Sequence, residues 1–177
     1  MIYRPAKTNE ELCQILDLQA RNLRSVLDPD TVAREGFVTL QHSLELLKRM
    51  QVMAPQFIAW DGKQVQGYAL CLHPEIQEAV PDLAPMFGSI ESHLEPETDY
   101  RVMGQVCIAR EFRNQGHFRK LYRALSSACS PLPLITEVAA DNPRSLGAHF
   151  AVGFTELTQH QEGSTLWHVI MLQAATK

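Results

Sequence analysis

The densest group of chemically capable side chains lies at the expected start of a helix. Residues 110–123 contain a single acid, Glu111, and five cations: Arg110, Arg113, Arg119, Lys120 and Arg123. Cations at a helix N-terminus oppose the helix dipole, so this placement makes sense where an anion binds. The unpaired N–H groups of a first helical turn form such a site, and Gly116 lets a ligand approach the backbone. The pattern predicts an anion site, with a solvated basic helix face as the alternative.

The segments around these cations have a recognisable order. A strand-like run over 100–109 comes before them, and a helix over 116–129 follows. The junction, Arg113-Asn114-Gln115-Gly116-His117-Phe118, resembles the acyl-CoA pyrophosphate loop of the GNAT N-acetyltransferase superfamily. The family pattern is Gln/Arg-x-x-Gly-x-Gly/Ala. Its first two fixed positions match, whereas Phe118 stands where Gly or Ala is usual.

A second stretch, residues 142–154, resembles the later motif of the same family. That motif has an Asn, a small residue three positions on, an aromatic residue near the helix end, and Gly-Phe. Asn142, Ser145 and Gly153-Phe154 fit it. The residues between the two motifs suffice for the helix and the strand that separate them in the family. The resemblance concerns fold and cofactor and says little about the substrate.

The resemblance implies where acetyl-CoA would bind. Ile108 and Arg110 would meet the pantetheine arm through their backbone groups, although Ile108 is equally an ordinary core strand residue. The pyrophosphate would lie on the amides around Asn114, Gly116, Phe118 and Arg119. Arg113 and Lys120 would add charge, and Asn142 and Ser145 would complete the cofactor site. For Asn142 the alternative is a helix cap and nothing more.

The resemblance also implies an acid and a base, because acetyl transfer needs a neutral amine and a proton for the departing thiolate. The usual acid in the family is a Tyr near the end of the second-motif helix. His149 takes that place here, and an imidazole can donate a proton near neutral pH. Glu137 is the first candidate for the base, ahead of Tyr68 and His73. The alternatives are that His149 only packs or caps, and that Glu137 pairs with an Arg.

Hydrophobic periodicity and cap residues predict the elements that must position these side chains. Residues 25–38 are polar and irregular. We expect strands over 2–6, 57–60, 65–72, 100–109, 132–138, 154–159 and 165–172, and helices over 9–23, 39–51, 116–129 and 143–152, with one more inside 74–99. The chain is expected to be α/β or α+β, with a mixed central sheet flanked by helices, in one domain over 1–177. This order matches the GNAT fold.

Segment 74–99 differs from the rest of the chain in charge. It holds seven acidic residues and no Lys or Arg, and its apolar residues from Leu83 to Leu94 have helical spacing. We expect a helical insertion over one face of the sheet. Acid near the mouth of the site would favour a cationic amine, and a solvated acidic helix is the alternative. The resemblance implies that residues 22–39 form most of the substrate wall.

Composition excludes several classes of protein. The net charge of −4 disfavours general binding to nucleic acid or anionic membranes. No apolar run approaches the roughly 20 residues of a membrane span, and the first residues lack a signal peptide, so a cytoplasmic location is expected. The four cysteines have no metal-ligand spacing and are expected to be small buried hydrophobes. A homodimer through the last strand, residues 167–172, is permitted.

The sequence therefore leads to an acetyl-CoA-dependent N-acetyltransferase that acts on a primary amine of a small molecule or protein. A non-catalytic acyl-CoA-binding or sensing module is the alternative, since His149 and Phe118 depart from the family pattern. A different anion-binding α/β protein is disfavoured, because the chain lacks both a Walker motif and a full Gly-x-Gly-x-x-Gly.

Overall fold

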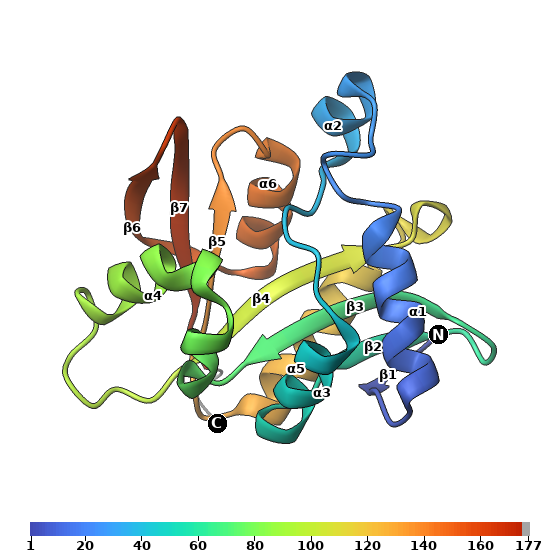
Figure 1. The fold of residues 1–177 in the computed structure, drawn as a ribbon, viewed down its shortest axis with the longest axis horizontal. Coiled ribbons are helices and arrows are strands. Elements are labelled where there is room, and N and C mark those ends of the chain that lie inside the picture. Colours follow the sequence, from blue (N-terminus) through green and yellow to red (C-terminus); the bar gives the residue numbers. More distant parts are fainter. Residues whose placement is uncertain (175–177) are drawn as a thin grey trace.

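Seven strands form one sheet in the computed structural model, which describes residues 1–174. The order across the sheet is β1-β2-β3-β4-β5-β7-β6 (Figure 1). The strands are β1 Ile2–Pro5, β2 Phe57–Trp60, β3 Val65–Leu72, β4 Arg101–Ile108, β5 Leu134–Ala139, β6 Thr155–Glu162 and β7 Thr165–Leu172. All neighbours are antiparallel except β4 and β5, which are parallel. The mixed sheet expected from the sequence is confirmed.

Helices cover both faces of this sheet. They are α1 Asn9–Ala20, α2 Pro29–Glu35, α3 Leu44–Met53, α4 Ala84–Glu91, α5 His117–Cys129 and α6 Pro143–Val152, with short 3-10 turns η1 Pro74–Ala79, η2 Pro81–Leu83 and η3 Arg110–Phe112. One hydrophobic core joins α1, α3 and α4 to one face of the sheet. A second core joins α5 to the opposite face. Adjacent core residues along a strand belong in turn to one core and the other, because they point to opposite faces.

Capping residues explain where the helices begin. The side chains of Thr8, Ser43 and Asn142 accept hydrogen bonds from the backbone N–H three residues on. Ser43 starts α3 at Leu44, so the helix expected from residue 39 begins later than predicted. Residues 29–35, which the sequence left irregular, form α2. Asp28 accepts from the N–H of Thr31 at 2.9 Å, and a proline occupies the first turn.

The two parallel strands separate soon after they meet. Only Arg101–Leu134 and Val102–Ile135 are paired between β4 and β5. β4 stays paired with β3 as far as Ile108, and β5 stays paired with β7 as far as Ala139. A notch therefore opens between the second halves of β4 and β5.

Three peripheral expectations can be placed on this fold. Segment 74–99 does contain a helix, α4, which packs over β6 and β7. The last strand, which was expected to permit a homodimer, is β7. It lies between β5 and β6, so both of its edges are occupied, and the free edge on this side of the sheet belongs to β6. Cys71, Cys107 and Cys129 are buried as expected, whereas Cys13 is exposed. Among residues 1–174, no helix has the length and apolar character needed to cross a membrane.

Candidate active site

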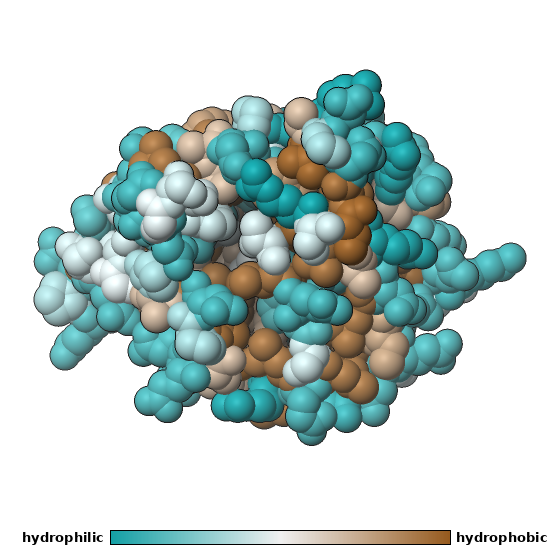
Figure 2. All heavy atoms as spheres, turned by 45° about the horizontal axis from the view of Figure 1, so that its top comes forward, coloured by the Kyte–Doolittle hydropathy of each residue, from teal (hydrophilic) through white to brown (hydrophobic). Residues whose placement is uncertain are grey.

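Two adjoining cavities lie in the notch between β4 and β5. The larger, of about 240 Å³, extends from Val106 and Ile108 to the loop before α5 and the start of α6. The smaller, of about 70 Å³, lies nearer the paired ends of the two strands and is lined by Glu137 and His149. Phe37, Val38, Val106 and Ser145 line both cavities. Figure 2, with the top of Figure 1 turned forward, shows apolar side chains exposed across the middle of this end of the molecule.

The free edge of β4 faces this notch. The N–H of Ala109 donates to the carbonyl of Gln66 at 2.8 Å, on the β3 side. Because backbone groups alternate along an antiparallel ladder, those of Val106 and Ile108 point away from β3. The Ile108 carbonyl accordingly accepts from the Nε of Arg113 at 3.0 Å. Within residues 1–174 the Ile108 carbonyl is thus taken, and the backbone groups of Val106 and the N–H of Ile108 remain at this edge for an extended ligand arm.

The loop before α5 has the geometry of an anion site. Asn114 and Gly116 have positive φ values of 60° and 76°. No side chain caps the first turn of α5, and a Cβ on Gly116 would meet nothing within 4 Å. Gly116, His117 and Phe118 line the larger cavity. Backbone N–H groups of a 13-residue helix are thus open toward a cavity of sufficient size for part of a ligand.

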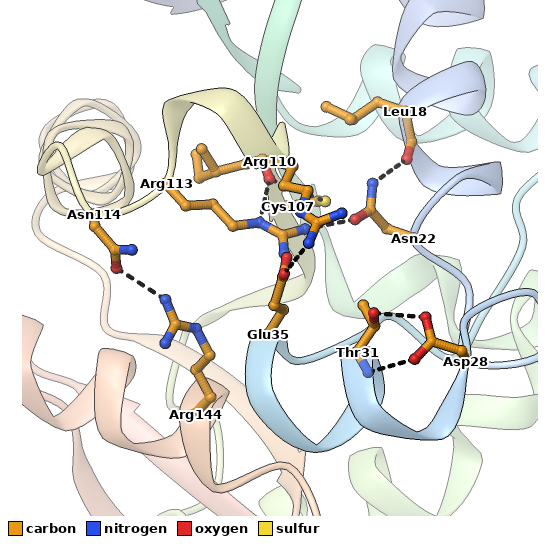
Figure 3. Close-up of polar contacts among 11 residues, drawn as sticks. Leu18, Asn22, Asp28, Thr31, Glu35, Cys107, Arg110, Arg113, Asn114 and Arg144 are labelled. Carbon is orange, nitrogen blue, oxygen red and sulfur yellow. Dashed lines mark hydrogen bonds and ion pairs between the residues drawn. The ribbon is translucent and has the colours of Figure 1, made fainter.

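Arg113 is already engaged by the protein. Its guanidinium donates to Glu35 at 2.7 Å and to the side chain of Asn22 at 2.6 Å, besides the bond to Ile108 (Figure 3). Arg110 donates to the other oxygen of Glu35 at 2.7 Å, but its side chain is 69% exposed. Arg113 therefore ties the end of β4 to α2 and to the segment that follows α1, and its charge is compensated by Glu35.

Of the other predicted cations, neither Arg119 nor Lys120 lines either cavity. Arg119 donates to the carbonyl of Ala151 at 2.8 Å. Lys120 is exposed and forms no ion pair within residues 1–174. Arg144, which the sequence reasoning did not single out, donates to the side chain of Asn114 at 2.9 Å and lines the larger cavity (Figure 3). Its position beside Asn142 was the available signal.

A strap, defined as residues 36–39, crosses the notch. The side chain of Asn142, only 5% exposed, caps α6 with its oxygen and donates from its nitrogen to the carbonyl of Phe37 at 3.2 Å. The backbone of Val38 pairs with Asn22 and Arg24, and the Arg24 guanidinium lies over the Phe37 ring. The strap thus connects the second motif to the segment that follows α1 and forms one wall of both cavities, and its role as a substrate wall stays a prediction.

His149 is buried and its proton is placed by its partners. Nδ1 lies 2.7 Å from the carbonyl oxygen of Ser145, which can only accept, so Nδ1 carries the hydrogen. Nε2 then accepts from the hydroxyl of Tyr122 at 2.7 Å. Burial lowers the pKa of His149 to about 4, so the ring is neutral at pH 7. This arrangement argues against His149 as a proton donor, and its predicted role as the acid stays a prediction.

Glu137 lies in the smaller cavity with a histidine behind it. Its Oε2 is 2.8 Å from Nε2 of His160, on β6, so the Arg partner considered from the sequence is wrong. Burial raises the pKa of Glu137, while the hydrogen bond and charge of His160 act in the opposite direction. A carboxylate with a raised pKa at a cavity wall is a suitable proton acceptor near neutral pH.

The other two candidate bases, Tyr68 and His73, are both engaged in hydrogen bonds within the protein. The hydroxyl of Tyr68 is fully buried and donates to Oε1 of Gln105 at 2.6 Å. Burial also raises the pKa of Tyr68 well above its usual value. His73 accepts from the N–H of Glu75 at the start of η1 and lines neither cavity. No residue of 74–99 lines them either, so the acidic rim stays a prediction.

A buried polar network joins α1 and β4 to the residues that follow the strap, Leu40 and His42. The side-chain amide of Gln19 donates to Gln105 and to Nδ1 of His42, and its oxygen accepts from the His42 backbone, all at 2.7 Å. Gln105 also donates to the carbonyl of Leu40 at 2.9 Å. Burial lowers the pKa of His42 to about 4, which keeps it neutral. Sequence reasoning missed this network, because its members are far apart in the chain and match no motif.

Comparison with known proteins places this fold. Neither a scan of protein-family models nor a search of curated protein sequences gives a match. Solved structures do match over nearly the whole chain. The ribosomal-protein-S18-alanine N-acetyltransferase from Escherichia coli is 12% identical, with a TM-score of 0.67, over 99% of this chain and 95% of that one.

Two further structures agree. A putative acetyltransferase from Salmonella typhimurium, solved with its cofactor acetyl-CoA, is 15% identical, with a TM-score of 0.64, over 100% of this chain and 95% of that one. A putative acetyltransferase of the GNAT family from Desulfovibrio desulfuricans is 11% identical, with a TM-score of 0.65, over 98% and 99%. At these identities the likeness is one of fold. The chain has the GNAT fold, as its two motifs predicted.

Proposed function

We propose that this GNAT-fold chain is an acetyl-CoA-dependent N-acetyltransferase that acts on a primary amine of a small molecule or protein. The observation that carries the proposal is the notch, which joins a free β4 edge to the uncapped start of α5. The similar structures support it, since one was solved with acetyl-CoA and another is named for acetylating a ribosomal protein.

The residues present fit the cofactor. The backbone of Val106 and the N–H of Ile108 would pair with the pantetheine arm at the free edge of β4, while the Ile108 carbonyl stays bonded to Arg113. The first-turn N–H groups of α5, around Gly116 and Phe118, would hold the pyrophosphate. Phe118 lines the larger cavity, and its ring packs against Tyr122 at 4.9 Å between centroids. Arg144 supplies charge at the wall of the larger cavity, and exposed Lys120 would add charge from α5, whereas Arg113 holds the loop in place.

Glu137 is the proposed base. An acceptor amine enters as an ammonium, and the free oxygen of the Glu137 carboxylate takes one of its protons. The neutral nitrogen then attacks the acetyl carbon, and the carbon–sulfur bond breaks as the amide forms. The nitrogen must lose a second proton, and the thiolate needs one. Because His149 is neutral and its N–H is engaged, we propose that this second proton reaches the sulfur from the amine itself.

A non-catalytic acyl-CoA-binding module is the second candidate. The observation that favours it is the enclosure of His149 between Ser145 and Tyr122, which engages the proton that the predicted acid would donate. Such a module would keep the phosphate site and lack turnover. The two candidates therefore differ in what happens after acetyl-CoA binds.

Thiol release from acetyl-CoA, measured with a panel of spermidine, free-N-terminal peptides and lysine peptides, tests the proposal. We expect one class of amine to accelerate release, and Glu137→Gln to lower kcat by about 10²–10⁴-fold. Glu156→Gln is a matched control. Glu156, on β6, also pairs with a histidine, His168 on β7, but neither residue lines either of the two cavities. Acetyl-CoA binding without release by any amine would favour the binding module.

A further inference from the structure

The β6–β7 hairpin places a histidine behind the proposed base. In the sheet register Glu137 is opposite Val169, and His160 is opposite Trp167. Successive residues alternate between faces, so Glu137, His160 and Trp167 share one face. Val169 on that face belongs to the core beneath α1, α3 and α4. The pair therefore lies on the side of the sheet opposite α5.

The two oxygens of Glu137 differ in their surroundings. Oε2 accepts from Nε2 of His160 at 2.8 Å, and the two side chains are 10% and 13% exposed. Oε1 has no hydrogen-bond partner within residues 1–174 and is not among their sealed, unpartnered atoms. Glu137 lines the smaller cavity, and His160 lines neither cavity. Oε2 is thus fixed by its hydrogen bond to His160, while Oε1 stays accessible.

We propose that His160 is a positioning residue for the proton transfer at Glu137. Its Nε2–H fixes Oε2, and so fixes the carboxylate plane with Oε1 toward the acceptor amine. The inference deepens the proposed function and rests on it. Nothing in the sequence indicated His160, since it is 23 residues from Glu137 and belongs to neither motif.

The charges around the pair determine the direction of the pH effect. Within residues 1–174, the charged groups that act on the pKa of Glu137 are His160, which lowers it, and Glu162, which raises it. On the strands packed alongside, Gln105, Trp167 and Val169 carry no charge. The lone acid of α4, Glu91, acts on Tyr100 instead.

Loss of His160 should therefore move the protonation of Glu137 toward higher pH. A base is active only when deprotonated, so the acid limb of the kcat profile should move in the same direction. Activity lost at pH 6.5 should largely return at pH 9. A purely structural role for His160 would instead lower kcat by the same factor at every pH.

The test compares pH profiles of thiol release for His160→Ala, His160→Gln and His168→Ala, with the fastest amine of the panel. His168 is the matched control because it pairs with Glu156 at 2.6 Å outside the cavities. We expect His160→Ala to lower kcat roughly 10-fold at pH 6.5 and less than about threefold at pH 9. His160→Gln, whose amide can still donate to Oε2, should recover most of the activity at pH 6.5, and His168→Ala should match the wild type.

An acid limb that stays unmoved in His160→Ala, with wild-type turnover intact, would overturn the role of His160 alone. Titration calorimetry with acetyl-CoA on the same samples separates this failure from a wider one. The wild type could bind acetyl-CoA while none of the amines tested accelerates thiol release. In that case the proposed transferase function fails, and the role of His160 fails with it. Thermal unfolding of each variant shows whether it is folded.

Discussion

Individual residues in the notch differ in whether their hydrogen-bonding capacity is already used. Arg113 is bonded to Glu35 and Asn22, and Asn142 is bonded to Phe37. Glu137 keeps one accessible oxygen, and the first N–H groups of α5 have no side-chain cap. Ligand contacts are therefore expected at the backbone and at Glu137, and the engaged side chains are expected to hold these groups in place.

A substitution at His149 tests whether this residue donates a proton in catalysis or only packs within the structure. His149→Gln places an amide oxygen where Nε2 accepts from Tyr122, and it removes the Nδ1–H bond to Ser145. Because the ring is neutral and its proton is engaged, we expect kcat of thiol release to fall less than about 10-fold. A loss of 10² or more in kcat, with acetyl-CoA affinity unchanged, would restore His149 as the acid.

At the scale of elements, the strap links the second motif to the rest of the site through Asn142. Replacing an N-cap residue by Ala costs about 1 kcal/mol of stability. We expect Asn142→Ala to show this cost and also to weaken acetyl-CoA binding, because Phe37 loses its partner and the strap loses its tie to α6. Ser43→Ala is the matched control, since Ser43 caps α3 outside both cavities.

Unfolding by urea and titration calorimetry check this prediction together. Equal stability losses with weaker binding only in Asn142→Ala would support the linking role. Equal binding by both variants would mean that Asn142 is a helix cap and nothing more, the alternative that the sequence left open.

Elements with strong periodicity and caps were predictable, and contacts between distant elements were not. The helices predicted from residues 9 and 143 begin after the caps Thr8 and Asn142, and the strands predicted over 57–60 and 65–72 and the last two strands formed. α2 was missed although Asp28 and Pro29 are cap signals, because its seven residues bury no apolar face. That omission also hid Glu35, and with it the partner of Arg113.

At the scale of the whole molecule, the site depends on one parallel pair inside an otherwise antiparallel sheet. β4 and β5 share two residue pairs and then separate, and each remains bonded to its other neighbour. Local sequence carries no mark of this separation, since both strands read as ordinary buried strands. The family resemblance implied only that backbone groups near the end of 100–109 meet the cofactor arm, and the register shows the separation that frees them.

The central claim is that this notch binds acetyl-CoA, and titration calorimetry with acetyl-CoA tests it most directly, with free CoA and ATP as comparisons. We predict micromolar binding that is lost in Gly116→Glu, which places a carboxylate at the start of α5. Gly163→Glu is the matched control, because Gly163 also has positive φ and open space but lines neither cavity. Wild-type protein that shows no binding at millimolar acetyl-CoA would contradict the account, as would binding that survives Gly116→Glu.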